Sequence, residues 1–328
     1  MRLALAVALA ATPLTAQEAD LSGIVAGHIL PRYETLAAES AALAAAAEAD
    51  CSPESADLRA AYGSAFDAWV AVSHLRFGPS ETEERAFELA FWPDPRGTTP
   101  KSLATLIRDA DPVVEDADAF GTVSVAARGF YAMEFLLYDA QFLAVEETAY
   151  RCALIEAVAR DIAGNAEAIL TDWEGGYADL LTIPGNDTYR TEAEAARQLF
   201  TALSTGLEFT VTQRLGRPLG TFDRPRPARA EARRSGRSLR HVVLSIDTLA
   251  DLAARLSDND PEIADAFAEA RAAAERVEDP TFASVSEVQG RLRVEALQQR
   301  LDTARKLAAL RIGEALGVEA GFNSLDGD

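Results

Sequence analysis

The sequence predicts an all-α protein with two helical domains of the four-helix-bundle type. Apolar residues make up 48% of the 328 positions, alanine dominates among them, and only 7% of residues are aromatic. Such a composition favours helices. Along most of the chain apolar residues recur three or four positions apart, as they do on one face of a helix. No segment of any length shows the alternation typical of a strand.

Local boundary signals place the helices. The first is expected at 20–48 with a kink at Pro31, because proline lacks the backbone N–H. The second begins at Ser52, read as an N-cap before Pro53. Later helices are expected at about 80–91, 100–110, 122–138, 146–174, 190–212, 235–256, 261–276 and 287–316.

The turn-rich segment 182–187 is the best candidate linker, since it carries proline, glycine and asparagine without any helical period. We therefore expect an N-terminal domain over 17–182 and a C-terminal domain over 188–328.

The first sixteen residues read as a signal peptide. Arg2 precedes an apolar run, and Leu14-Thr15-Ala16 offers a small-residue cleavage site, so cleavage is expected after Ala16. No later apolar run approaches the roughly 20 residues that span a bilayer. We expect an exported protein of the periplasm.

Cys51 and Cys152 are the chain's two cysteines. An even number in an exported protein predicts a disulfide. The alternative is two buried thiols.

Charge narrows the choice of partners. The net charge of −21 argues against nucleic acid. Against this background, the segment 214–240 holds nine arginines beside only Asp223 and Glu231. These arginines either dock acidic helix faces within the molecule or bind an anion, for which Arg237 and Ser238 at a helix start are well suited.

The stretch 129–138, GFYAMEFLLY, contains a single group that is charged at neutral pH, Glu134. Its neighbours are too apolar for an exposed helix, so Glu134 is expected to be buried and must find a cation, a metal, hydrogen-bond donors or a proton. Tyr131 lies three residues earlier on the same helical face. Arg237 is our candidate partner for Glu134.

Familiar hydrolase signatures do not occur in the sequence. It has no His-Glu-x-x-His, no glycine-rich phosphate loop and no Gly-x-Ser-x-Gly. Histidine occurs only at His28, His74 and His241. His28 lies on the apolar side of the first helix, as a core histidine or a site ligand; the other two we interpret as structural or surface groups.

Several stretches together resemble the imelysin family. The family's Gly-x-His-x-x-Glu motif corresponds to Gly129–Glu134, with Tyr131 in place of histidine. Further matches are RFGP at 76–79, FWPD at 91–94, RSGRSL at 234–239 and the closing stretch 321–328.

This resemblance implies two helical domains with a cleft between them, export, and a role either as a metallopeptidase or in iron acquisition. It makes Tyr131 and Glu134 ligand-binding candidates, with Glu134 as a possible ligand of iron or another divalent metal. Tyrosine at 131 weakens the metal role, because a phenol must first lose its proton.

We expect a ligand- or metal-binding protein serving iron acquisition. The alternatives are a metal-dependent peptidase with Glu134 as ligand or base, and a non-catalytic component that binds a membrane iron-uptake partner. The Trp92-Pro93 loop is interpreted as a packing corner rather than a rim of the cleft.

Overall fold

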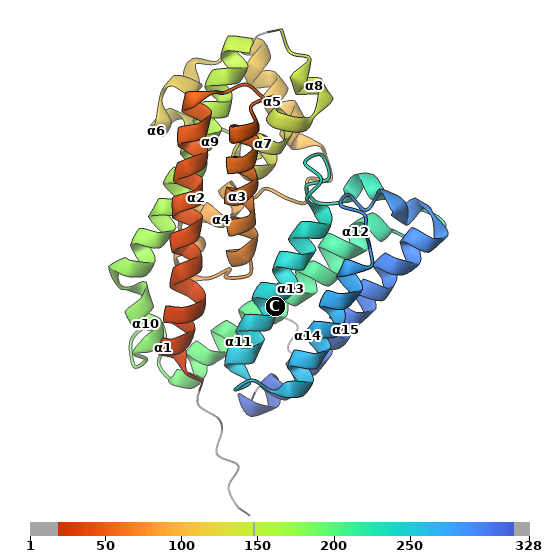
Figure 1. Ribbon diagram of the computed structural model, residues 1–328. Coiled ribbons are helices and arrows are strands. Elements are labelled where there is room, and N and C mark those ends of the chain that lie inside the picture. Colours follow the sequence, from red (N-terminus) through yellow and green to blue (C-terminus); the bar gives the residue numbers. More distant parts are fainter. Residues whose placement is uncertain (1–18, 147, 318–328) are drawn as a thin grey trace, which may run out of the picture.

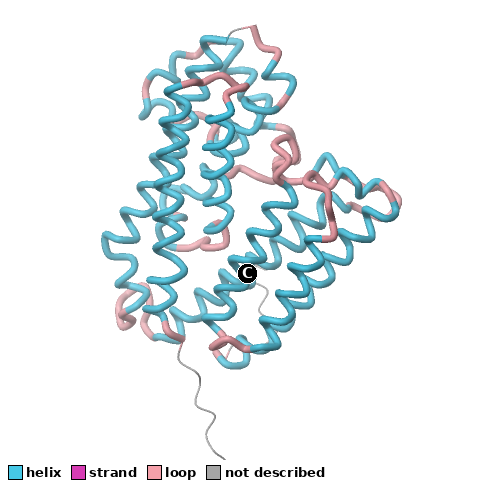
Figure 2. The backbone as a smooth tube through the Cα atoms, in the orientation of Figure 1, coloured by secondary structure: helices cyan, strands magenta, loops and turns pink. Residues whose placement is uncertain are grey.

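The computed structural model describes residues 19–146 and 148–317, which form helices joined by short loops (Figure 2). The all-α prediction is confirmed. Within these ranges there is no strand, and extended pairing is limited to an isolated bridge between Thr221 and Arg224. The expected signal peptide and the closing stretch 321–328 lie outside the described residues.

The helices form two groups that stand side by side in Figure 1. The first group comprises α1 (Leu21–Ile24), α2 (Leu30–Ala49), α3 (Ala56–Val72), α4 (Arg85–Leu89), α5 (Thr98–Asp109), α6 (Ala117–Phe120), α7 (Gly129–Tyr138), α8 (Ala140–Leu143), α9 (Thr148–Asp172) and α10 (Ala178–Thr182). The second comprises α11 (Glu192–Phe209), α12 (Gly216–Leu219), α13 (Ser238–Leu256), α14 (Pro261–Glu275) and α15 (Val288–Ala315).

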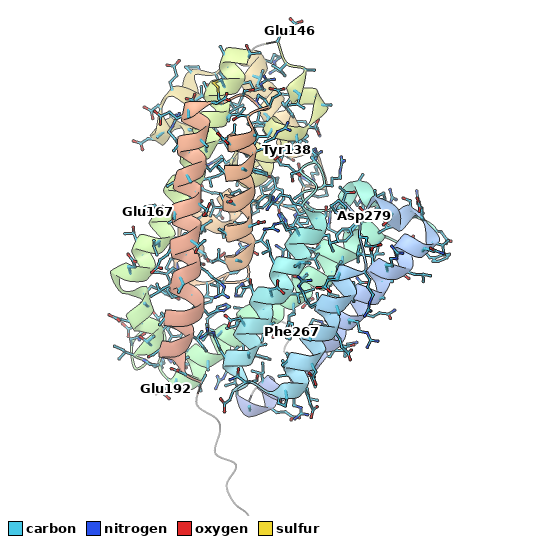
Figure 3. All side chains as sticks on the ribbon, in the orientation of Figure 1. Tyr138, Glu146, Glu167, Glu192, Phe267 and Asp279 are labelled. Atoms are coloured by element: carbon cyan, nitrogen blue, oxygen red, sulfur yellow. A yellow bond between two sulfur atoms is a disulfide. The ribbon has the colours of Figure 1, made fainter. Side chains whose placement is uncertain are left out.

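Each group buries its own apolar faces. The two groups meet at an interface, which we call the seam, where α13 and α11 contact helices of the first group. In the first group α2 packs between α3 and α9, and α7 packs against α9; in the second, α11, α13, α14 and α15 pack on one another. Helix α13 lies against α3, and α11 contacts α1. Side chains of both groups project into the space between them (Figure 3). The division into domains at 182–187 stays a prediction.

The helix starts differ from the sequence prediction at three places, and the first is the helix expected at about 80–91, where two 3-10 turns precede α4 and the α-helix begins only at Arg85. Ser55, not Ser52, caps α3, and its Oγ accepts a hydrogen bond from the backbone N–H of Leu58. The helix expected at 122–138 begins only at Gly129, because the preceding residues form a short 3-10 turn.

The first predicted helix contains a π-helical turn, Val25–Ile29, just before Pro31. A π turn shifts the backbone hydrogen bonds and leaves carbonyls to be satisfied by other groups. Here Arg255 of α13 donates to the carbonyls of Gly23 and Gly27, and Arg32 donates to the carbonyl of His28. The π turn therefore also ties the two groups together.

Gly129 shows why α7 begins where it does. Its φ of +72° lies in the region that glycine adopts without strain. A Cβ at this position would come within 2.3 Å of the backbone oxygens of Glu88 and Leu89. The motif's glycine thus lets α7 start in direct contact with the end of α4, which fixes the direction in which Tyr131 and Glu134 project.

None of the helices described here is long and apolar enough to cross a bilayer.

Cys51 and Cys152 form a disulfide, as the sequence predicts, with their Cα atoms 5.2 Å apart. It closes a loop of 101 residues and ties the end of α2 to the start of α9. We expect the Cys51→Ala/Cys152→Ala double variant to lose about 3–5 kcal/mol of unfolding free energy, because a large loop is freed in the unfolded chain. Urea unfolding of the oxidised wild type and the variant measures this loss. Equal stabilities would contradict the prediction.

Candidate functional site

A pocket of about 430 Å³ opens where the two groups of helices meet. One wall comes from the first group and includes Trp69, Trp92 and Tyr131; the other comes from the second group and includes Phe209 and Leu249. Polar side chains occupy the rest of the lining: Ser73, His74, Arg76, Thr205, Glu208, Thr212, Gln213, Arg214, Glu231 and Ser245. A hollow that combines aromatic and apolar walls with convergent polar groups is typical of a ligand site.

A buried ion pair forms the polar floor of this pocket. The Nε of Arg214 donates to Oε2 of Glu231 over 2.7 Å, and the two side chains are 6% and 2% exposed. The hydroxyl of Tyr131 donates to the other oxygen, Oε1, over 2.5 Å. Both carboxylate oxygens of Glu231 are therefore in use, one toward each group of helices.

The remaining guanidinium nitrogens of Arg214 are also occupied. Nη1 donates to Ser245 Oγ over 2.8 Å and Nη2 to Ser73 Oγ over 3.3 Å. Arg214 itself lies in the π-helical turn Thr210–Leu215 that continues α11. The hydroxyl of Ser238 donates to the backbone oxygen of Glu231 and holds that residue in place.

The protonation states follow from this arrangement. Burial alone would raise the pKa of Glu231, but the Arg214 guanidinium, His241 and the Tyr131 hydroxyl outweigh it and hold that pKa well below its ordinary value. Burial and the Glu231 carboxylate raise the pKa of Tyr131 well above that of a free phenol. The floor thus contains an ionised carboxylate and a protonated tyrosine.

His241 completes the cluster from α13. Its ring is fully buried and lies edge-on to Phe66, with ring centroids 4.4 Å apart. Its Nδ1 is 3.3 Å from Oε2 of Glu231, but neither ring nitrogen forms an aligned hydrogen bond to any described residue. His241 therefore contributes to the field around Glu231 rather than to a directed bond.

A second chain of polar side chains, Asp251–His28–His74, runs from the seam to the pocket, with both histidines buried and Asp251 partly exposed. His28 Nδ1 lies 2.7 Å from Asp251 Oδ2, and His28 Nε2 lies 3.0 Å from His74 Nε2. The contact with Asp251 requires a proton on His28 Nδ1. In neutral His28 the other nitrogen, Nε2, therefore carries no proton and accepts a hydrogen bond from the Nε2–H of His74. Neutral His74 then has no proton on Nδ1, and this residue lines the pocket.

Of the two motif residues predicted to bind a ligand, the structure places only one in the pocket. Tyr131 lines the pocket, whereas Glu134 does not. The buried carboxylate of Glu134 accepts from the backbone N–H and the hydroxyl of Ser235, over 2.9 and 2.8 Å. Arg234 lies 4.0 Å from its other oxygen. Glu134 is thus satisfied by donors from the loop before α13.

The expected pairing of Arg237 with Glu134 is wrong. Arg237 instead bonds the carboxylate of Asp67 and the carbonyl of Gly63 on α3. Gly63 allows the guanidinium this approach, since a Cβ there would lie 2.8 Å from it.

His28 is buried in the seam, and His74 and His241 are interior residues rather than surface ones. The Trp92-Pro93 loop, expected to be a packing corner, lines the pocket.

The sequence reasoning missed Glu231, Arg214 and His241. The available signal was the position of Glu231 as one of two acids within the arginine-rich segment, where an acid has unusually many potential partners. Its partner Tyr131 is 100 residues away, so no local spacing could have connected the two.

The surroundings of the two buried carboxylates, Glu231 and Glu134, do not fit a bound metal ion. A metal needs several deprotonated ligands that converge. Within the described residues, such a grouping of His, Cys, Asp and Glu atoms occurs only at Cys51, Cys152 and Glu156, where the two thiols form the disulfide. Glu231 faces a guanidinium that repels cations, and Glu134 is bound by Ser235.

Comparisons with known proteins agree on one fold. The family model described as Imelysin matches residues 29–308. An imelysin-like protein from Psychrobacter arcticum 273-4 is 20% identical with a TM-score of 0.75, covering 92% of this chain and 96% of its own. A protein from Parabacteroides distasonis ATCC 8503, described as an iron-regulated protein A precursor, is 13% identical with a TM-score of 0.74, covering 93% and 97%. No curated protein matches significantly.

The buried pair at the floor gives a stability prediction. Glu231→Gln keeps the shape but leaves Arg214 buried without a carboxylate, so unfolding free energy should fall by about 3 kcal/mol. Glu208→Gln is the matched control, because Glu208 lines the same pocket, is partly exposed and forms no ion pair with a described residue. It should change stability by less than about 0.5 kcal/mol. Urea unfolding at neutral pH distinguishes them; similar losses for both variants would refute the role of the pair.

The histidine pair gives a pH prediction. Burial lowers the pKa of His28, and burial together with nearby His28 lowers that of His74 well below its ordinary value. Because the unfolded histidines have the higher pKa, the unfolded chain gains protons first as pH falls below about 6.5, so stability is full above this pH and lost below it. Between about pH 7 and pH 5.5 we expect a loss on the order of 2 kcal/mol.

The His28→Gln/His74→Gln variant tests this assignment by urea unfolding at the two pH values. Its stability should change less than that of the wild type over the same interval, since carboxylates common to both proteins cancel. An identical pH dependence in the two proteins would contradict it.

Proposed function

The chain belongs to the imelysin family, and from this premise we propose that it is an exported, non-catalytic binding protein that serves iron acquisition, with the pocket between the helix groups as its binding site. Two features support export and the iron role: the signal-peptide pattern of residues 1–16, and a structural relative described as an iron-regulated precursor.

The observation that carries the proposal is the pocket itself. Its aromatic walls, Trp69, Trp92, Tyr131 and Phe209, suit a planar or apolar organic group. Its floor is a neutralised ion pair, with hydroxyl groups and the bare nitrogen of His74 left to orient a ligand. Such a lining favours binding over cleavage, because the hydroxyl that lies against a carboxylate, that of Tyr131, has a raised pKa and keeps its proton, and this carboxylate is already paired with Arg214.

Iron would enter this pocket already chelated. The residues do not offer a bare ion the oxygen or nitrogen donors that it requires. A small organic complex satisfies the metal by its own ligands and presents a surface that the pocket can contact. The ligand we propose is therefore an organic iron complex or the organic chelator alone.

Fluorescence tests the proposal, since Trp69 and Trp92 line the pocket. Ferric complexes of citrate, of a hydroxamate and of a catechol are titrated against the mature protein, each beside its iron-free chelator. We expect saturable quenching by at least one complex or chelator. Absence of saturable binding throughout the series would refute this function, and chelator-sensitive cleavage of denatured casein would show an enzyme instead.

A matched pair of variants locates the binding. Thr205 lines the pocket, whereas Thr201, one turn earlier on α11, is exposed outside it. Both hydroxyls donate to the carbonyl four residues earlier, so the two positions have the same local role. Thr205→Phe should weaken binding about tenfold by filling the pocket, while Thr201→Phe should leave it unchanged. Equal affinities would place the ligand elsewhere.

A further inference from the structure

The arginine-rich segment divides into two parts that behave differently. Arg214, Arg234, Arg237 and Arg240 pair with carboxylates inside the molecule, three of them with acids of the first helix group. Five others, Arg217, Arg224, Arg226, Arg229 and Arg233, form no ion pair with any described residue. The expected docking within the molecule therefore describes the first four, whereas anion binding by the segment stays a prediction, and its candidate Arg237 is engaged by Asp67.

Three of the unpaired arginines, Arg224, Arg226 and Arg229, follow an exposed apolar residue, Phe222, in the same loop. Phe222 is 74% exposed in the tight turn closed by the Thr221–Arg224 bridge. On the neighbouring helix α15, Val288 and Leu292 are 69% and 57% exposed. We call Phe222, Arg224, Arg226, Arg229, Val288 and Leu292 the tip surface.

Arg291 fixes the two halves of the tip surface to each other. It lies on α15 within one turn of Val288 and Leu292, and its Nη1 donates to the carbonyls of Leu219 and Thr221 over 2.7 and 3.2 Å. Its guanidinium also lies 5.5 Å from the centre of the Phe222 ring. Phe222 is therefore held outward by a buried anchor, although water is a poor environment for it.

The charge of the tip surface indicates which kind of partner binds it. The chain as a whole carries −21, yet this surface holds an excess of unpaired arginines over its own acids, Asp223 and Glu287. A membrane surface with anionic headgroups offers phosphates to arginines and a hydrocarbon boundary to exposed phenylalanine, valine and leucine. The acidic remainder of the molecule is repelled by the same surface, which would orient the protein with this tip toward it.

We propose that the tip surface docks the protein onto an anionic phospholipid bilayer, with Phe222 entering the headgroup region. No residue of the tip surface lines the pocket, so docking does not depend on the ligand-binding function. It also differs from a transmembrane anchor, because the contact is peripheral and weakens as salt screens the charges.

Vesicle flotation of the mature protein tests the charge contribution. The wild type should float with phosphatidylcholine vesicles that contain about one-third phosphatidylglycerol, should not float with phosphatidylcholine alone, and should be released by high salt. Arg224→Gln/Arg226→Gln should reduce partitioning about 30-fold, at roughly 1 kcal/mol per arginine. The control Arg190→Gln/Arg197→Gln changes two exposed arginines that likewise form no ion pair with a described residue, and should bind like the wild type.

Fluorescence tests the apolar contribution. Phe222→Trp should show a blue shift of its emission with the anionic vesicles, whereas Leu310→Trp, an exposed position farther along α15, should not. Failure of the wild type to bind anionic vesicles, or equal binding by both arginine double variants, would overturn the proposal. Binding of the tip surface to an acidic polypeptide but not to vesicles would also overturn it, and would mark a protein-docking site instead.

Discussion

The buried contact of Glu231 with Arg214 and Tyr131 is the constraint on which the site depends. A carboxylate inside a protein must be surrounded by donors or a cation, and Glu231 obtains these from both groups of helices at once. Arg214 comes from the end of α11 and Tyr131 from α7, so the pair fixes their relative position. The pocket forms beside this contact, where the helix surfaces separate.

Other acidic residues at the seam are also satisfied by hydrogen-bond donors from the opposite group of helices. Asp67 receives two arginines from the start of α13, Glu134 receives the backbone and hydroxyl of Ser235, and Asp251 receives His28. Each places an acid of one group against donors of the other. Because Glu134 is buried, losing its donors would leave a desolvated charge, so this polar contact specifies how the helices meet more strictly than apolar packing alone would.

Substitution of tyrosine for the family's histidine fits this environment. A phenol donates a single hydrogen bond and stays protonated, which suits a position against an ionised carboxylate already paired with arginine. Its ring also stacks near Trp92 and meets Phe66 edge-on, so the residue serves the aromatic wall and the polar floor together. This environment thus keeps Tyr131 in its protonated form, which is a poor ligand for a metal ion.

Sequence alone determined the all-α class, most helix boundaries and the burial of Glu134, because these follow from composition, helical period and the cost of a charge among apolar neighbours. It predicted the Cys51–Cys152 disulfide from the even number of cysteines and left two thiols as the alternative, which the structure excludes. It could not determine which donors satisfy that charge. Arg237 and Ser235 are two residues apart, and only the path of the loop before α13 decided that Ser235 meets Glu134 while Arg237 meets Asp67. Likewise Glu231 and Tyr131 are 100 residues apart, and their contact exists only because two groups of helices pack together. Local sequence sets the period and the caps; long-range packing sets the partners of each buried charge.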